Sequence, residues 1–331
     1  MGNVIAEQYK VYVGGLYGNS PLSPRTAETL RSKILEYGFR VVELDQQPDL
    51  YVAYDLNPKE LKDVEGIGLP KERRVLIRNE PEVVWPINFS RRNVSRFGLV
   101  ISLGRSKAFD ENADNWPQFW VQTPPRISEK ERLKHSVIMC GNKISLVRGE
   151  LYSLRRLVLA KSTSLDLFGF GWDYSTRKKL RILFSTLKIL LKAGRTPHFF
   201  GIGSWFHPTH MSKGAPSDKL ATLAKYRTTI VIENSREYIT EKLFDAFFAR
   251  TIPIYVGPAL DDFMIPNHLV ISVEPTVGAL LAGMKQSELL DYDEWRENLD
   301  NWLKQDEVKL NWNQENVYLR VLNRILAQML I

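Results

Sequence analysis

The residues of this chain that could do chemistry are concentrated between positions 228 and 258, TTIVIENSREYITEKLFDAFFARTIPIYVGP. The pattern predicts a buried strand, a polar turn, a helix that begins near Thr240, and a second strand that ends at a Gly-Pro stop. In open α/β sheets, ligands bind outside the carboxyl ends of the strands. The polar side chains that crowd this turn therefore form a candidate ligand site: Glu233, Asn234, Ser235, Tyr238 and Thr240.

Lys242 is the residue that suggests what the ligand is. It falls in the first turn of the expected helix, with Thr240 as the expected N-cap and Glu241 beside it. Glu241 suits the partial positive charge of a helix N-terminus, whereas Lys242 is repelled by it. A bound anion, held by the backbone amides and the ammonium group, would remove that conflict. The alternative is a lysine that points to solvent, but the polar residues around it favour an anion site.

A second cation and two glycines extend the candidate site. Arg148 follows another expected strand and starts the helix expected over 148–161, and its guanidinium fork suits phosphate oxygens. Gly169 and Gly171 follow a strand and would allow a ligand to approach the backbone closely, although their spacing is not GxGxxG. Glu233 could accept ribose hydroxyl groups or could cap the turn after it. No Walker A pattern occurs, which argues against an NTPase.

Strands and helices alternate along the chain, which is typical of an α/β fold with largely parallel sheets. A first series has strands at 10–15, 39–44, 49–55, 74–79 and 97–103, with helices at 24–37, where Ser23 is the N-cap and Pro24 the first residue, and at 58–64. A polar loop is expected over 104–130. The second series has strands at 134–140, 166–170, 229–233 and 252–256, with helices at 148–161, 177–193 and 240–249. We therefore expect two Rossmann-like domains, residues 1–130 and 131–331, that face each other across a cleft.

The closing segment predicts an amphipathic helix. Its apolar residues have helical spacing and suit either core packing or contact with a membrane surface. They are Val317, Val321, Leu322, Ile325, Leu326 and Met329.

Composition narrows the class of protein. The 331 residues are 44% apolar and 25% charged, with a net charge of +7, which favours anionic partners or simply solubility. Cys140 is the only cysteine, so neither an internal disulfide nor a thiolate zinc cluster can form, and its apolar surroundings predict a buried thiol. No signal core or spanning segment is evident, so we expect a cytoplasmic protein, with room for a peripheral contact at the inner face of a membrane.

The stretch from 228 to 258 resembles the donor-site signature of the α-1,3-fucosyltransferases, glycosyltransferase family 10, of the bacterial type. That signature runs through an apolar strand, Glu-Asn-Ser, Tyr-Ile-Thr-Glu-Lys, an aliphatic helix and Pro-Ile-Tyr. Upstream, Asn142, Arg148 and Tyr152 with DLFGFG, and Lys219 with the KYR sequence at 225–227, are similar to further family motifs. The resemblance extends over roughly residues 134–275.

The resemblance implies a GT-B fold, a GDP-fucose donor bound by the second domain, and inverting transfer to a hydroxyl of a glycan, without a cofactor or an obligatory metal. Lipopolysaccharide is the acceptor type that the bacterial members suggest. Arg148 and Lys242 would bind the diphosphate, and Glu241 the sugar hydroxyls. Asn234 and Tyr238 would line the donor site. Asn142, Gly169, Gly171, Glu233, Ser235 and Thr240 are further donor-site candidates.

The acceptor domain offers one carboxylate for catalysis. RVLIRNEPEVVWP, residues 74–86, resembles the strand and turn where the family places its base, and Glu80 is the matching residue. Inverting transfer needs a base that removes the proton of the attacking hydroxyl. Glu82 is two residues further on and stays open as the alternative base.

Two other readings remain. Only two residues separate Ser235 from Tyr238, fewer than in many animal members, so the donor could be another nucleotide sugar. A protein of a different class, a basic nucleic-acid- or lipid-surface-binding protein without catalysis, would also suit the charge. The intact Glu241–Lys242 pair argues against it, and no RNA-binding aromatic signature occurs, so we expect no nucleic-acid partner. The sequence does not indicate an oligomeric state.

Overall fold

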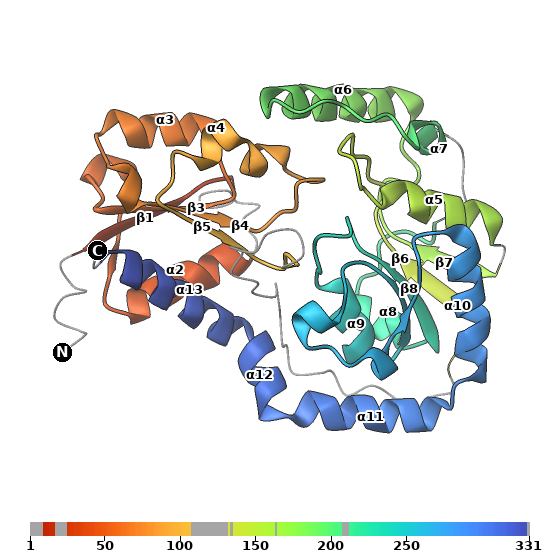
Figure 1. Ribbon diagram of the computed structural model, residues 1–331. Coiled ribbons are helices and arrows are strands. Elements are labelled where there is room, and N and C mark those ends of the chain that lie inside the picture. Colours follow the sequence, from red (N-terminus) through yellow and green to blue (C-terminus); the bar gives the residue numbers. More distant parts are fainter. Residues whose placement is uncertain are drawn as a thin grey trace.

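The computed structural model describes residues 9–16, 25–106, 132, 135–162, 164–206 and 212–329. The expected Ser23 cap with Pro24, and most of the loop expected over 104–130, lie outside these ranges. Figure 1 shows two α/β lobes side by side, each built on its own sheet. Both sheets have five parallel strands, so the predicted fold class is confirmed.

The first sheet has the strand order β2-β1-β3-β4-β5. Its strands are β1 (Lys10–Gly14), β2 (Arg40–Val41), β3 (Leu50–Tyr54), β4 (Arg74–Arg78) and β5 (Leu99–Ser102). Helices follow at α2 (Arg25–Glu36), α3 (Pro58–Gly66) and α4 (Arg91–Val94), with 3₁₀ turns η1 (Leu44–Gln46), η2 (Lys71–Arg73) and η3 (Pro86–Phe89). The strand expected over 39–44 shortens to two residues because the chain turns into η1 at the edge of the sheet.

The second sheet has the strand order β10-β9-β8-β6-β7. Its strands are β6 (Ser136–Met139), β7 (Leu165–Phe168), β8 (Thr228–Ile232), β9 (Ile252–Val256) and β10 (Ile271–Ser272). The helices of this part are α5 (Tyr152–Lys161), α6 (Thr176–Lys192), α7 (Ile202–Phe206), α8 (Lys219–Leu223), α9 (Lys242–Phe248), α10 (Val277–Leu289), α11 (Tyr292–Lys304) and α12 (Asp306–Trp312), with 3₁₀ turns η5 (Asp261–Phe263) and η6 (Asn267–Leu269). All residues of β8 and β9 are buried, as expected for parallel strands covered on both faces.

The last helix, α13 (Gln314–Met329), returns to the first sheet. Its buried residues Val317, Val321, Leu322 and Ile325 share a hydrophobic core with the side chains of β1, β3, β4 and β5. The expectation of 131–331 as one domain placed this helix in the second lobe, whereas its side chains complete the core of the first. Of the two roles that its amphipathic pattern allowed, the structure has core packing.

The two domains contact each other through backbone and side chains. The amide of Ile239 donates to the carbonyl of Gly104 at 2.8 Å, so the turn after β8 is bonded to the loop after β5. Arg195, after α6, forms an ion pair with Glu82 at 2.7 Å. The end of α6 packs Ala193 into a core of the first domain. These contacts hold the carboxyl ends of the two sheets against each other.

Leu322→Ala should destabilise the protein by about 2–5 kcal/mol, because it leaves a cavity in the core between α13 and the first sheet. Urea denaturation measures the loss. The matched variant Leu326→Ala, one turn later and only partly buried, should cost clearly less. Equal costs for the two variants would contradict the packing of α13 described above.

Candidate active site

The second sheet changes direction between β6 and β8. The chain runs from β6 outward to β7 and then returns to place β8 on the other side of β6, which creates a switch point where ligands typically bind. β6 and β8 pair only at Val137–Thr229 and Ile138–Ile230, so the two strands separate beyond these residues. The pocket that opens there has four charged side chains in its lining: Arg155, Lys219, Lys242 and Asp245.

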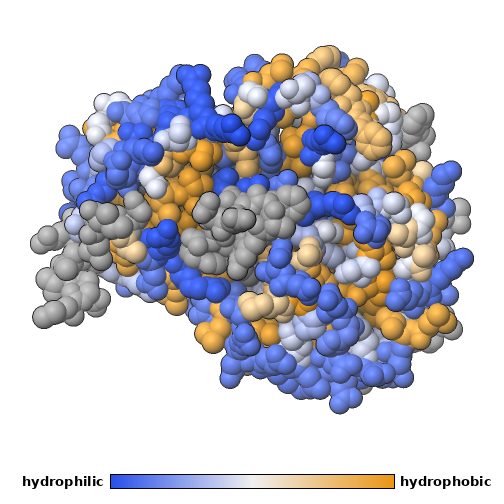
Figure 2. All heavy atoms as spheres, viewed as in Figure 1, coloured by the Kyte–Doolittle hydropathy of each residue, from blue (hydrophilic) through white to orange (hydrophobic). Residues whose placement is uncertain are grey.

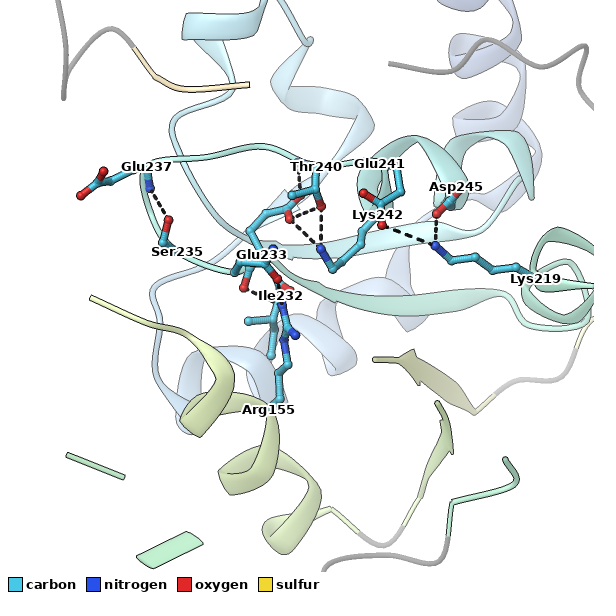
Figure 3. Close-up of polar contacts among 11 residues, drawn as sticks. Arg155, Lys219, Ile232, Glu233, Ser235, Glu237, Thr240, Glu241, Lys242 and Asp245 are labelled. Carbon is cyan, nitrogen blue, oxygen red and sulfur yellow. Dashed lines mark hydrogen bonds and ion pairs between the residues drawn. The ribbon is translucent and has the colours of Figure 1, made fainter. Parts of the chain in front are cut away.

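Glu233 organises the turn after β8 (Figure 3). Its carboxylate is completely buried and accepts hydrogen bonds from the amide and hydroxyl of Thr240, at 3.0 and 2.5 Å. The ammonium group of Lys242 lies 3.2 Å from the same carboxylate and 2.6 Å from the hydroxyl of Thr240. Of the two roles open for Glu233, the structure has the capping one, and Glu233 also holds Lys242.

This network changes the argument about Lys242. Helix α9 starts at Lys242, with Glu241 rather than Thr240 at its N-cap position. The buried charge of Glu233 already compensates the lysine, so its position near the helix start does not by itself require an anion. Lys242 nevertheless lies at the switch point and is one of the residues that line the pocket.

Glu241 lies between two cations. Burial acts to raise the pKa of its carboxyl group, but Lys242 and Lys219 outweigh burial and hold the pKa at about 2. The ammonium group of Lys219 also forms an ion pair with Asp245 and lies 4.0 Å from Glu241. Glu241 is therefore an ionised, partly exposed acceptor next to the pocket, which suits hydrogen bonds from hydroxyl groups.

Arg155 is a cation of this site that the sequence did not reveal. It is almost fully buried in α5, and its guanidinium donates to the carbonyls of Ile232 and Glu233, at 2.6 and 2.8 Å. It also donates to the side chain of Asn234, at 3.1 Å. Arg155 thus fixes the end of β8 and the orientation of Asn234. The one signal in the sequence is a pair of arginines, Arg155-Arg156, inside an otherwise apolar helix.

Arg148 was expected to start a helix, but α5 begins only at Tyr152. It lies in a turn between β6 and α5, where its side chain is exposed and forms no ion pair or hydrogen bond with a described residue. The guanidinium group is thus available to a ligand.

The glycines after β7 serve the protein's own packing. A Cβ at Gly169 would lie 2.0 Å from the carbonyl oxygen of Cys140, and one at Gly171 would contact Tyr174. Asn142 is buried and donates to the carbonyl of Gly171 at 3.3 Å. The close approach expected of a ligand at both glycines is therefore made by the loop after β6. Cys140 is buried, as predicted, and burial raises the pKa of its thiol.

Tyr238 and Ser235 are buried away from the pocket. The ring of Tyr238 packs edge-on against Phe89 of the first domain, with centroids 6.2 Å apart, and its neighbours Arg78 and Arg105 also belong to that domain. Ser235 accepts a hydrogen bond from the amide of Glu237 at 3.3 Å. Tyr238 was expected to line the donor site, whereas the structure places it in the interface between the domains.

Glu80 faces the second domain. It follows β4 by two residues and is partly exposed. Its charge acts on Lys143 and Tyr152, both from the loop and helix after β6. Desolvation and the nearby cations Lys242 and Arg155 lower the pKa of the Lys143 ammonium group, although Glu80 and Glu241 act in the opposite direction. Lys143 therefore connects the two halves of the site, and its position after a strand end was a signal that the sequence analysis did not use.

Asp55 holds the backbone of Glu80. It follows β3 directly, is fully buried, and accepts hydrogen bonds from the amides of Asn79 and Glu80, at 2.8 and 3.0 Å. The side chain of Asn88 donates to the same oxygen at 2.5 Å. Burial and the charge of Glu80 raise the pKa of Asp55 to about 7. Asp55, like Arg155 and Lys143, has a role in this site that the sequence did not reveal, although it too stands at a strand end.

Glu82, the alternative base, is engaged elsewhere. Its carboxylate pairs with Arg195 of the second domain, and burial raises its pKa although Arg195 acts against this. Glu82 thus contributes to the contact between the domains, while the neighbouring Glu80 faces Lys143.

Solved structures of the GT-B fold are similar to nearly the whole of this chain. The Anabaena protein Alr3699/HepE, solved with UDP and glucose, is 11% identical with a TM-score of 0.56, over 97% of this chain and all of that one. A glycosyltransferase from Rickettsia africae is 11% identical with a TM-score of 0.54, over 97% of this chain and 98% of that one. This chain therefore has the GT-B fold.

More specific relationships are not evident. No protein-family model matches the chain, and no curated protein is significantly similar to it. A solved α1,3-fucosyltransferase is 14% identical, with a TM-score of 0.49, over 97% of this chain and 88% of that one.

The described residues contain no helix with both the length and the apolar composition of a membrane span. They also contain no cluster of three or more His, Cys, Asp and Glu side chains that could hold a metal ion.

Two substitutions of Asp55 distinguish what its charge contributes to stability from what its hydrogen bonds contribute. Asp55→Ala leaves the amides of Asn79 and Glu80 without their side-chain acceptor and removes the shorter hydrogen bond of the Asn88 side chain, so it should cost about 2–4 kcal/mol. Asp55→Asn keeps the accepting oxygen and should cost less. Because the folded pKa is about 7 and the unfolded value about 4, wild-type stability should fall as pH rises through this window.

Urea denaturation at about pH 5 and about pH 8 measures both effects. Wild type should lose stability relative to Asp55→Asn between these two pH values, because only the wild type has a buried group to ionise. A difference between the two proteins that does not change with pH would show that Asp55 is not protonated in the folded state.

Proposed function

We propose that the protein is an inverting glycosyltransferase that transfers the sugar of a nucleoside diphosphate sugar to a hydroxyl of a glycan. The observation that supports this most directly is the position of Glu80 two residues after β4, where Asp55 holds its amide at 3.0 Å and the neighbouring Glu82 pairs with Arg195 of the second domain. Glu80, and Glu241 and Lys242 at the switch point of the second sheet, all act electrostatically on Lys143, which follows β6. A base on one domain thus faces cations on the other.

The proposed mechanism uses the base of the first domain and the cations of the second. Glu80 removes the proton of the acceptor hydroxyl while its oxygen attacks the anomeric carbon of the donor sugar. The bond from that carbon to the diphosphate breaks, and the diphosphate leaves with the bonding electron pair. Lys242, Lys143 and the exposed Arg148 would stabilise its charge. Glu241 would accept hydrogen bonds from the sugar hydroxyls.

We propose GDP-fucose as the donor, on the resemblance of residues 228–258 to the α-1,3-fucosyltransferase signature. The runner-up is the same chemistry with another nucleotide sugar. The structures that are similar in fold support that alternative, because Alr3699/HepE was solved with UDP and an α-glucosyltransferase, at a TM-score of 0.52, with UDP as well.

A panel of nucleotide sugars tests the donor. GDP-fucose should raise the melting temperature and be slowly hydrolysed, because the cations at the switch point bind its diphosphate. Lys242→Met should weaken GDP binding by about 10–100-fold, as for a lost hydrogen bond to a charged group. Lys285→Met, at an exposed position of α10, is the matched control. A response only to UDP sugars would reject fucose, and no response to any donor would reject the transferase.

Glu80→Gln should lower the rate of transfer to a glycan panel by about 10²–10⁴-fold, because the amide cannot take the proton. Affinity for GDP, measured by calorimetry, should be unchanged. Glu82→Gln is the matched control two residues away and should retain most of the transfer activity. Loss of transfer in Glu82→Gln, with activity kept in Glu80→Gln, would assign the base to Glu82.

A further inference from the structure

The excess positive charge of the chain lies in one segment. Residues 176–206, which comprise α6, the connection after it and α7, contain seven Lys and Arg residues and no Asp or Glu. The net charge of the complete chain is +7, so the remainder is neutral overall. The high pI therefore describes a single surface region rather than the whole molecule.

The outward face of α6 is apolar as well as basic. Phe184 and Leu191 are 65% and 58% exposed, and Leu180 is also exposed. These residues are four and seven positions apart, so they form one stripe along the helix. A phenylalanine and two leucines in water are costly, since each keeps apolar area that burial would remove.

Four cations flank this stripe, and all of them are exposed: Arg177, Arg181, Lys188 and Lys192. None of the four forms an ion pair or a hydrogen bond with a described residue. At 100° per residue they lie immediately beside the apolar stripe on the outward side. The opposite side of α6 is fixed by packing, because Leu190 is buried and Ile189 and Ala193 contact a core of the first domain. The basic and apolar face therefore cannot rotate inward.

The apolar surface continues beyond the helix. Phe199 and Phe200, in the connection to α7, are exposed, Phe200 by 71%, and Phe206 at the end of α7 is exposed too. Phe170, after β7, is also exposed. Figure 2 shows apolar residues gathered in the upper right part, where α6 and α7 lie in Figure 1, with hydrophilic residues between them. Large exposed apolar patches on a folded protein mark contact surfaces.

We propose that this face of α6, with Phe199 and Phe200, docks on an anionic lipid bilayer. A nucleic acid or an acidic protein would pair with the cations but would leave Phe184 and Leu191 in water. A neutral apolar partner would cover the phenylalanine but would leave the four cations without counter-charges. The surface of an anionic bilayer accepts both, because the apolar side chains enter the acyl boundary while Lys and Arg remain among the phosphates.

The position of α6 suits a bilayer-bound enzyme. The helix contacts η3 of the first domain, and Arg195, just after α6, pairs with Glu82, two residues from Glu80. The docked helix therefore packs beside the loop that carries the proposed base. The docking itself does not depend on the proposed function, since it rests only on the surface of α6 and its surroundings.

Vesicle co-sedimentation of the full chain tests the proposal. We expect binding to phosphatidylcholine vesicles that contain phosphatidylglycerol, weak binding to pure phosphatidylcholine, and release by salt. Phe184→Ser combined with Lys188→Glu should weaken binding by at least about tenfold, since each basic residue near the surface contributes about fivefold. The matched control, Leu289→Ser with Lys285→Glu, changes an exposed pair at the same spacing on α10 and should bind as wild type does.

The outcomes separate the alternatives. No binding of the wild-type protein to anionic vesicles overturns the proposal, and so does an equal loss in the α6 and α10 variants. Phe184→Ser alone should also weaken binding, and its failure to do so would mean that charge acts without insertion, as for a nucleic-acid or acidic protein partner. Thermal melting and hydrolysis of a nucleotide sugar in solution should be unchanged in the α6 variant, which distinguishes lost docking from lost folding or lost transferase activity.

Discussion

The completely buried carboxylate of Glu233 is the constraint on which the donor half depends. A charge without access to water is tolerated only where hydrogen bonds and a counter-charge compensate it. Thr240 and Lys242 supply both, so the turn after β8 closes on Glu233 and delivers Lys242 to the switch point. Glu241 is placed beside the pocket by the same turn, between Lys242 and Lys219. Removing the carboxylate would leave Thr240 and Lys242 without the acceptor that positions them.

The first domain repeats this principle with different residues. Asp55 is buried at the end of β3 and holds the amides after β4, which places Glu80 toward Lys143. In both domains, then, a buried Asp or Glu side chain at the end of one strand fixes a neighbouring turn. That turn carries a partly exposed residue of the site. The contacts of Arg195 and Ile239 bring the two ends together, so the separation of base and cations depends on the interface as well as on each sheet.

Helix α6 contacts the first domain and also carries the proposed docking surface. Its inner side packs on both domains, and its outer side carries a row of exposed apolar residues with four exposed cations beside it. The pattern of the amphipathic helix at the end of the chain favoured core packing, with a surface contact as the alternative. It is instead part of a core, because α13 covers the first sheet.

The sequence by itself determined the α/β class, nearly all strands and the positions of Glu80, Glu233 and Lys242 at strand or helix ends, because apolar periodicity and turn residues are local signals. Only the tertiary structure decided which side chains meet. Glu233 could equally have faced a ribose, Tyr238 the donor, and α13 the second domain. Asp55, Lys143 and Arg155 acquire their roles from neighbours that are between 25 and 100 residues away in the chain. Such contacts depend on strand order and domain packing, and no local pattern encodes them.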